Sequence, residues 1–312
     1  MTQAESAAVV VLGGINMDLV TVAPRFPDAG ETIVGERFLT YPGGKGANQA
    51  VAVARLGEHV AMVGRVGTDV FGSQLLDSLT ENGVDVSAVG YAAGTSSGIA
   101  VINIDDSAQN RIIQILGANQ SCGESEAHEV STLLARASTL MLQLEVSIEL
   151  SLRVARSALA QGKTVILDPG PVRPFPKEFL SCCSIITPNE TEAEALVGFP
   201  VVDRASAAQA AGALLGQGAH IVVIKLGALG TYYAVPQGGE FVRPFRVQAV
   251  DSVAAGDAFN GALAVSLAEG KELSEAVRFA SAAGALATTK YGAQDSMPTR
   301  EEVDMLAGTR RS

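Results

Sequence analysis

The stretch VDSVAAGDAFNGAL, residues 250–263, places one carboxylate, Asp257, directly behind three small residues and ahead of a helix-like run. Small residues at Ala254, Ala255 and Gly256 leave the N–H groups at the start of a helix open to an anion. Such a turn suits phosphoryl transfer, in which catalysis is mainly positioning and stabilisation of charge. Asp257 is then a candidate base for an attacking hydroxyl, and we expect the helix N-terminus to favour its ionised form. The alternative is that Asp257 only caps the helix.

A second glycine-rich stretch, YPGGKGANQAVAVARLG at residues 41–57, places Gly43, Gly44 and Gly46 around Lys45 just before a helix. Glycines let a ligand approach the backbone, and a helix N-terminus offers unpaired N–H donors. A simple turn would show the same pattern. The stretch is not a P-loop, which requires Gly-x-x-x-x-Gly-Lys-Ser/Thr, and the first strand–helix turn lacks the Gly-x-Gly-x-x-Gly fingerprint of dinucleotide-binding proteins.

Polar residues also follow several candidate strands at their carboxyl ends. They are Asn16, Asp18, Glu145, Asp168, Asn189, Glu190, Glu192 and Lys225. In open α/β sheets, ligands collect at the carboxyl ends of the strands, so these side chains are candidates for one common site. A single acid or amide after a strand is usually a helix cap, but the same feature after five strands is difficult to attribute to capping alone.

Short apolar runs predict the strands that would position these residues. The runs span residues 7–15, 59–67, 139–145, 163–169, 183–189 and 220–227. Each is almost continuously hydrophobic, as expected for strands of a parallel sheet that is covered on both faces. Helical patterns lie between them, at residues 48–57, 70–83, 147–162 and 204–218, and three of the four close on a glycine that suits a C-cap. This alternation predicts right-handed strand–helix–strand units and an α/β sandwich.

Two stretches break the alternation, residues 16–41 and residues 97–115. The first carries proline, glycine and threonine among short alternating apolar patches, and the second has the pattern of a hairpin with polar residues at its turn. Neither fits a buried parallel strand. We expect them to form a small β-sheet lid that closes over a ligand, although edge strands without a lid role would show the same pattern.

The composition is that of a globular α/β protein. The chain has 312 residues and a net charge of −11, which argues against general binding to nucleic acid or to a membrane surface. The N-terminus lacks the pattern of a signal peptide, and no apolar run approaches the ~20 residues that span a bilayer. Cys122, Cys182 and Cys183 have no metal-binding spacing and are expected to be reduced thiols. We therefore expect a cytoplasmic protein with a single domain, residues 1–312.

Taken together, these motifs resemble the ribokinase family of carbohydrate kinases. The matching segments, in family order from about residue 9 to residue 298, are GGINMD, PGGKGANQAVAVARLG, LQLE, ITPNETEAE, KLGALG, VDSVAAGDAFNGAL and YGAQDSMP. They are most similar to those of family members that phosphorylate D-ribose. The resemblance implies a ribokinase-like three-layer α/β sandwich with a mainly parallel central sheet, a small β-sheet lid and a homodimer formed through the lid.

The resemblance also implies a role for each matching position. Asp257 would be the catalytic base, and Ala254, Ala255 and Gly256 would form the anion hole for the transferring phosphate. The positions that would hold the hydroxyls of ribose are Asn16, Asp18, Gly44, Lys45, Asn48 and Glu145, together with Asp257. Those that would bind the nucleotide are Asn189, Lys225, Gly227, Gly230, Gly256 and Ser281.

Two cations are implied beside the nucleotide. Glu192, with Asn189, would hold Mg²⁺ through water, since Mg²⁺ prefers hard oxygen ligands and retains several waters. A K⁺ ion would activate the enzyme from a site next to the anion hole. The positions that match the K⁺ site, several of them through backbone carbonyls, are Asp251, Val253, Ala287, Lys290, Gly292 and Ser296.

The implied activity is transfer of the γ-phosphoryl group of ATP to the 5-hydroxyl of D-ribose, which gives D-ribose 5-phosphate. The alternatives are a kinase of the same family that acts on deoxyribose, fructose, 2-keto-3-deoxygluconate or a nucleoside and, remotely, a non-catalytic sugar-binding regulator. Three residues depart from the family pattern: Lys225 stands where Thr is usual, Ser281 where His is frequent, and Met17 where Ala is usual. They concern nucleotide affinity and sugar choice more than the type of reaction.

Overall fold

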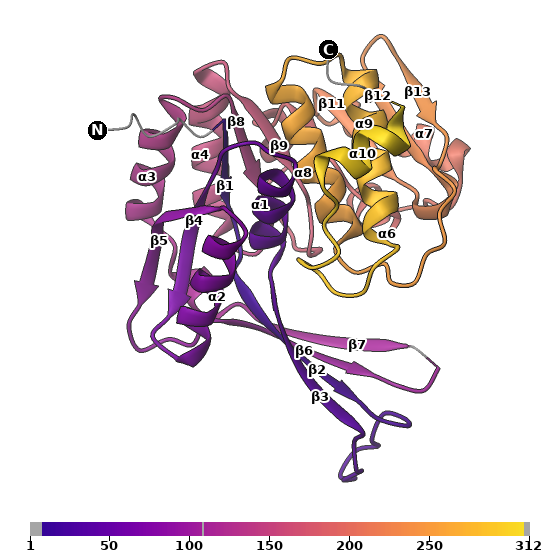
Figure 1. The fold of residues 1–312 in the computed structure, drawn as a ribbon. Helices are drawn as coiled ribbons and strands as arrows, with labels where there is room; N and C mark the ends of the chain where they lie inside the picture. The colour runs from indigo at the N-terminus through magenta and orange to yellow at the C-terminus, as the bar shows by residue number, and fades with distance from the viewer. Residues whose placement is uncertain (1–7, 108, 309–312) are drawn as a thin grey trace.

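Nine strands form the central sheet of the protein, and most of them run parallel (Figure 1). The computed structural model describes residues 8–107 and 109–308. In spatial order the strands are β13 (Gly238–Val242), β12 (Thr231–Val235), β11 (Ile221–Lys225), β10 (Ile185–Ile186), β9 (Thr164–Leu167), β8 (Thr139–Leu142), β1 (Val9–Leu12), β4 (Val60–Gly67) and β5 (Asp85–Ala92). Neighbours from β5 to β11 pair in parallel, whereas β12 and β13 add an antiparallel edge. The predicted mainly parallel sheet is confirmed.

Each apolar run that was predicted as a strand contains one, namely β1, β4, β8, β9, β10 or β11. Most of these strands are shorter than the runs. Strands β5, β12 and β13 were not predicted. Two of them, β5 and β13, are edge strands with many exposed or half-buried residues, so they lack the continuous apolar pattern. Ala7, the first residue of the expected run 7–15, lies outside the described residues, as do residues 1–6.

Helices cover both faces of the sheet and make this a three-layer sandwich. One layer holds α1 (Lys45–Arg55), α2 (Val70–Glu81), α8 (Ala255–Ala268), α9 (Leu273–Ala287) and α10 (Arg300–Ala307). The other holds α3 (Glu124–Leu134), α4 (Ile148–Ala160), α5 (Glu178–Ser181), α6 (Glu190–Val197) and α7 (Arg204–Gly216). Val9 and Val11 of β1 pack into the first core, while Val10 and Leu12 pack into the second, as the two-residue period of a strand requires. No helix in the described ranges is long and apolar enough to span a membrane.

All four predicted helices are present, as α1, α2, α4 and α7, and a glycine lies directly after the C-cap residue of each one. These glycines have positive φ angles, from 73° to 108°, a region that glycine enters at little cost. Helix α1 differs from the prediction at its start. It begins at Lys45, three residues earlier than expected, so the glycine-rich stretch forms its first turn.

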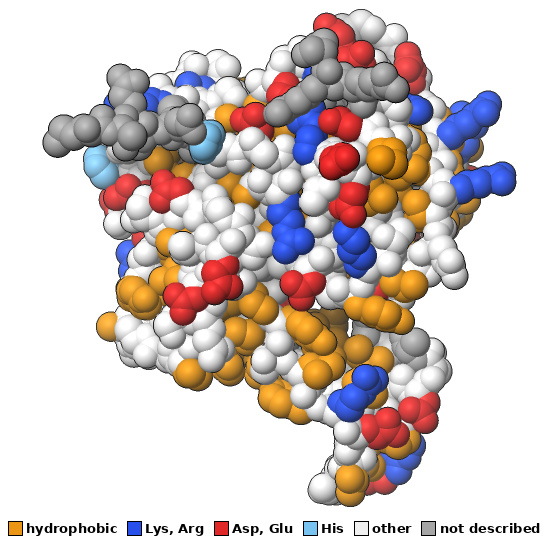
Figure 2. Space-filling view, in the orientation of Figure 1, with side chains coloured by type: hydrophobic (Ala, Val, Ile, Leu, Met, Phe, Trp, Pro, Cys, Tyr) orange, Lys and Arg blue, Asp and Glu red, His pale blue; other side chains and the backbone are white. Residues whose placement is uncertain are grey.

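The two stretches that broke the alternation form a separate four-stranded sheet, which projects from the sandwich (Figure 1). Its strands are β3 (Arg37–Gly43), β2 (Asn16–Val22), β6 (Gly98–Ile104) and β7 (Asn110–Ile115). We call this sheet the lid sheet. Figure 2 shows apolar side chains where it joins the body and several charged side chains toward its projecting end. Phe38, Ile112 and Ile113 are among its exposed large side chains. Strand β3 ends only two residues before α1, so the lid sheet joins the sandwich beside that helix.

Helix α8 is buried along most of its length and packs against both α1 and α9. Gly261 permits the contact with α1, because a Cβ at this position would lie 2.5 Å from Cβ of Ala52. Close packing of the two helices brings their first turns together: Nζ of Lys45 lies 4.0 Å from Oδ1 of Asp257. The packing of small residues therefore determines how near the lysine and the candidate base can lie.

Replacing Gly261 by valine is expected to destabilise the fold, because the new side chain would overlap Ala52 of α1. Overpacking of this kind costs about 1–3 kcal/mol, which urea denaturation would measure as a lower free energy of unfolding. Gly212→Ala in α7 is the control, since its added Cβ meets no atom within 4 Å and alanine favours a helix by about 1 kcal/mol. Equal losses in the two variants would contradict the packing argument.

Candidate active site

The first turn of α8 has the form of the predicted anion-binding turn. Ala254 precedes the helix with a φ angle of 58°, and among the described residues it is the only non-glycine with positive φ. This left-handed conformation costs an alanine roughly 1–2 kcal/mol. The N–H groups of Gly256 and Asp257 have no helical acceptor before them, whereas the N–H of Ala255 donates to the carbonyl oxygen of Ser252 at 3.3 Å. Of the expected donors, the N–H of Gly256 is therefore open to an anion and that of Ala255 is engaged, while the N–H of Asp257 adds a second open donor.

Asp257 lies at the third position of α8 and not at its N-cap, so the helix-capping alternative is wrong. Its side chain, 5% exposed, accepts hydrogen bonds of 3.0 Å from Nδ2 of Asn48 and Nε2 of Gln49 in α1. Burial raises the pKa of Asp257 and outweighs the opposing effect of Lys45, while nearby Asp168 raises it further. We expected the helix N-terminus to favour the ionised form; burial opposes this and is the largest influence on the pKa of Asp257. A raised pKa makes the carboxylate a stronger base.

Lys45 connects three buried acids at the carboxyl edge of the sheet. It follows Gly44, which has a φ angle of 92° and turns the chain into α1. Its ammonium lies 3.0 Å from Oδ2 of Asp168, 3.9 Å from Oε1 of Glu192 and 4.0 Å from Oδ1 of Asp257. Burial by itself would lower the pKa of Lys45, but the three carboxylates raise it well above its usual value. The lysine therefore remains charged and compensates part of their charge.

Asp168 belongs to this cluster, although it was noted in the sequence only as a polar residue after a strand. It is completely buried and lies between two lysines, with Lys45 at Oδ2 and Nζ of Lys225 3.5 Å from Oδ1. Burial raises the pKa of Asp168, but the two ammonium groups outweigh it and bring the pKa below its ordinary value. Its ionised carboxylate therefore contacts both Lys45, a predicted ribose residue, and Lys225, a predicted nucleotide residue.

Two glutamines of the cluster, Gln49 and Gln143, were not predicted at all. Nε2 of Gln49 donates both to Asp168, at 2.9 Å, and to Asp257, at 3.0 Å. Nε2 of Gln143 donates to Oε1 of Gln49 at 2.6 Å, which fixes the orientation of the Gln49 amide. Gln49 follows Lys45 by four residues, a spacing that places both on one side of a helix and could have identified it.

The predicted ribose contacts gather around Glu145. Nδ2 of Asn16 donates to its Oε1 at 3.1 Å, and the backbone N–H of Lys45 donates to its Oε2 at 2.7 Å. Gln114 of strand β7 also donates to Glu145, so the lid sheet contacts the site directly. Burial raises the pKa of Glu145 against the effect of Lys45. The site thus has a second acidic centre where the lid sheet meets the sandwich.

Asp18 and Asn48 provide acceptors near this second centre. Asp18 lies against Gly43, where a Cβ would be 2.4 Å from its Oδ2. Burial, together with the charges of Glu145 and Asp257, raises the pKa of Asp18 to about 7. Oδ1 of Asn48 is a buried oxygen without a hydrogen-bond partner. Since buried polar atoms are nearly always paired, this oxygen is suited to accept a hydrogen bond from a ligand.

Asn189 and Glu192 form a capping box at the start of α6, a structural role that the sequence analysis did not predict. Oδ1 of Asn189 accepts from the N–H of Glu192 at 2.8 Å, and Oε2 of Glu192 accepts from the N–H of Asn189 at 2.9 Å. Burial and Asp168 raise the pKa of Glu192 against the two lysines of the cluster. Its Oε1 takes no part in the cap. One carboxylate oxygen therefore remains for a water of Mg²⁺, and these residues fit the implied ion.

The predicted nucleotide residues lie around the end of β11. Lys225 is its last residue, and Gly227 and Gly230 form the tight turn into β12, with φ angles of 48° and 110°. Ser281 lies on α9, where its hydroxyl donates to the carbonyl oxygen of Val277 at 2.7 Å and lies 3.1 Å from Oγ1 of Thr231. Its proton is thus engaged within the protein, and its oxygen is placed to accept from the Thr231 hydroxyl.

The implied K⁺ site lies where the segment before α8 meets the loop after α9. Oδ2 of Asp251 accepts from the N–H of Gly292 at 3.1 Å, and its Oδ1 accepts from the N–H of Val253 at 3.0 Å. The N–H of Asp251 also donates to the carbonyl oxygen of Thr288 at 3.1 Å. The structure therefore brings Asp251, Val253 and Gly292 together beside the anion-binding turn.

At the other predicted K⁺ positions, the side chains are already engaged within the protein or carry no ligand atom. Ala287 ends α9, and its carbonyl oxygen lies 3.5 Å from the N–H of Lys290. The side chain of Lys290 pairs with Glu302 at 2.9 Å, and the hydroxyl of Ser296 donates to the carbonyl oxygen of Ala293. Backbone carbonyls, which K⁺ accepts as ligands, therefore remain the groups that fit this ion.

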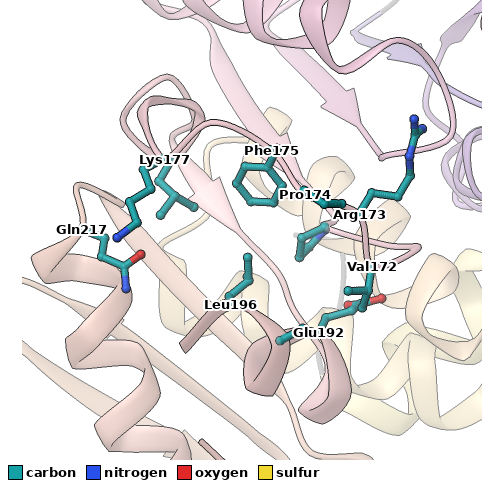
Figure 3. A pocket seen from close by; sticks show the side chains of 11 residues that line it. Val172, Arg173, Pro174, Phe175, Lys177, Glu192, Leu196 and Gln217 are labelled. Atoms are coloured by element: carbon teal, nitrogen blue, oxygen red, sulfur yellow. The ribbon is translucent and has the colours of Figure 1, made fainter. Parts of the chain in front are cut away.

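A pocket of about 340 Å³ has Glu192 in its wall (Figure 3). Its walls are mainly apolar, with Phe175 and Leu196 facing the space and Lys177 and Gln217 at one end. Apart from Glu192, none of the predicted site residues lines it. The pocket therefore meets the predicted site only at Glu192.

Comparison with known proteins identifies the family. Residues 6–300 match the pfkB family carbohydrate kinase model. The ribokinase of Haemophilus influenzae is 40% identical over 295 residues, which cover 94% of this chain and 95% of the relative. The ribokinase of Bacillus subtilis is 37% identical and covers 96% and 98% of the two chains.

Comparison with a solved structure shows that the similarity extends to the fold. The structure of Arabidopsis thaliana ribokinase complexed with ribose and ATP superposes with a TM-score of 0.90 at 33% identity and covers 98% of this chain and 100% of that one. Similarity extends over nearly the whole length in each case. The chain therefore has the ribokinase-like fold and belongs to the pfkB family of carbohydrate kinases.

Proposed function

We propose that the protein transfers the γ-phosphoryl group of ATP to the 5-hydroxyl of D-ribose. The observation that carries the proposal is the buried carboxylate of Asp257 in the first turn of α8, with an anion-binding turn on one side and hydroxyl-binding side chains on the other. Relatives named ribokinase, and a related structure described with ribose and ATP, support this acceptor and donor.

In the proposed reaction, Asp257 removes the proton of the 5-hydroxyl as the hydroxyl oxygen attacks the γ-phosphorus. A new P–O bond forms while the bond to the bridging β–γ oxygen breaks, and ADP leaves with that oxygen. The N–H groups of Gly256 and Asp257, together with Lys45, stabilise the charge on the phosphoryl oxygens. Asn48 and Gln49 hold the carboxylate of Asp257 in one orientation throughout.

The sugar would lie between the lid sheet and the sandwich. Its hydroxyls would donate to the carboxylates of Asp18 and Glu145 and to Oδ1 of Asn48, the buried oxygen without a partner. Asn16, Lys45 and the backbone at Gly44 complete the proposed set. Closure of the lid sheet would exclude water and so limit hydrolysis of ATP.

Two cations complete the proposed site. Glu192 and Asn189 would hold Mg²⁺ through water, and the ion would neutralise charge on the phosphates. No group of three His, Cys, Asp or Glu side chains within the described ranges could hold a metal ion alone, so ATP would supply the remaining ligands. The carbonyls around Asp251 and Gly292 would hold K⁺, whose charge would support the anion-binding turn.

We also propose a homodimer formed through the lid sheet. Phe38 is 63% exposed and Ile113 is 64% exposed on this sheet, which is apolar surface that a second copy could cover. Sedimentation as a monomer at micromolar concentration would contradict this. The use of ATP favours the cytoplasm as the place of action.

The acceptor is tested by measuring ADP formation with MgATP and a panel of acceptors, with and without K⁺. The panel contains D-ribose, deoxyribose, fructose, 2-keto-3-deoxygluconate and nucleosides. We expect a large preference for D-ribose that increases with K⁺. If only another acceptor is phosphorylated, the proposed mechanism stands and the choice of D-ribose is wrong, which would be attributed to Met17 and the lid sheet. Sugar binding without turnover of any acceptor would indicate a regulator.

Asp257→Asn is expected to lower kcat about 10²–10⁴-fold, because an amide cannot accept the hydroxyl proton. Ribose affinity, measured by calorimetry, should change little, since the amide keeps the shape of the carboxylate. Asp77→Asn, an exposed acid on α2, is the control and should leave kcat unchanged. If the Asp257 variant turns over within a few-fold of the unmodified enzyme, Asp257 is not the base.

The KM for ribose is expected to rise as the pH falls through about 7, the pKa to which burial raises Asp18. Protonation of this carboxyl removes an acceptor for a sugar hydroxyl, so affinity is highest above the pKa and is lost below it. Asp18→Asn should raise KM above that pH and flatten its pH profile. A KM that stays constant in the unmodified enzyme would contradict the prediction.

A further inference from the structure

Lys225 lies where the end of β11 meets the acidic cluster. Its backbone N–H donates to the carbonyl oxygen of Pro188 at 2.9 Å, which fixes the strand end beside Asn189. The side chain is 12% exposed, and Nζ lies 3.5 Å from Oδ1 of Asp168. The lysine therefore points inward from the proposed nucleotide side and not into solvent.

The ammonium of Lys225 also lies beside the anion-binding turn of α8. A Cβ placed on Gly256 would lie 3.4 Å from Nζ of Lys225. Gly256 supplies one of the open N–H groups of this turn, and its missing side chain leaves the space beside the ammonium free. An anion held by the turn would thus lie within reach of this cation.

Asp168 holds Lys225 less closely than it holds its other partners. Its Oδ2 accepts from Lys45 at 3.0 Å and from Gln49 at 2.9 Å, whereas Lys225 is 3.5 Å from Oδ1. Charge-assisted N–H···O bonds are ordinarily about 2.7–2.9 Å long. Lys225 therefore has the longest contact of the three donors, and Lys45 and Gln49 keep their hydrogen bonds to the buried carboxylate when Lys225 moves away.

We propose that Lys225 is a catalytic residue that leaves Asp168 and binds the γ-phosphoryl group during its transfer. This rests on the proposed phosphoryl transfer and adds a cation to it. The ammonium neither gives nor takes a proton; it stabilises charge on the phosphoryl oxygens while the P–O bonds form and break as described above. Lys45 acts from the sugar side and Lys225 from the nucleotide side, and Asp168 receives Lys225 again when ADP leaves.

Lys225→Met is expected to lower kcat about 10²–10³-fold, the effect of removing one group that stabilises developing charge. The KM for the sugar should change much less, and Lys225→Arg should retain part of the activity. Lys271→Met, an exposed lysine after α8, is the control and should keep full kcat. Thermal melting of each variant establishes that it folds. A Lys225→Met kcat within twofold of the unmodified enzyme would overturn the proposal.

The double variant Asp168→Asn/Lys225→Met separates a catalytic role from charge compensation. If Lys225 only balanced Asp168, neutralising both residues would restore the turnover that Lys225→Met loses, and such recovery would overturn the proposal. We expect the double variant to remain at least as impaired as Lys225→Met.

Nucleotide binding gives a measurement that does not depend on the acceptor. By calorimetry with Mg²⁺, Lys225→Met should weaken binding of a non-hydrolysable ATP analogue about tenfold more than binding of ADP, because only the analogue carries a γ-phosphate. Equal weakening of the two, or none, would overturn the proposal. If the tenfold difference is found but ribose is not phosphorylated, the proposed acceptor fails while the role of Lys225 stands.

Discussion

The candidate site depends on the burial of several carboxylates close to one another. A buried carboxylate costs several kcal/mol unless charges and hydrogen bonds compensate it. Here Asp168, Glu192 and Asp257 share the ammonium of Lys45, and Asp168 also faces Lys225. Side-chain amides supply the remaining hydrogen bonds. The positions of these carboxylates and lysines therefore depend on one another. Their charge compensation fixes the geometry of the site more than it stabilises the fold.

Small residues in the core allow this compensation. A Cβ on Gly46 would lie 2.8 Å from Cα of Gly13, so the first turn of α1 can rest directly on the end of β1. Gly261 lets α8 approach the same helix from the other side. Both contacts let the helix backbones approach closely, so the first turns that carry Lys45 and Asp257 lie side by side. The apolar packing of β1, α1 and α8 thus positions the polar side chains at their ends.

The lid sheet is continuous with the residues that would hold the sugar. Strand β2 begins at Asn16, which is hydrogen-bonded to Glu145, and β3 ends directly before the turn into α1. Gln114 of β7 donates to the same Glu145. Any movement of the lid sheet must therefore act on the hydrogen bonds of Glu145, which couples closure to the sugar side of the site.

The sequence by itself determined six strands of the central sheet, four helices, the lid strands and the grouping of Asn16, Glu145 and Asp257, because each depends on a local pattern or on motif order. Only the tertiary structure decided how these groups are paired and charged. Asn48 and Asp257 are 209 residues apart in the chain, yet they share a hydrogen bond. Burial and such distant contacts set the raised pKa of Asp257 and place Asp168 between two lysines, and no local pattern encodes them.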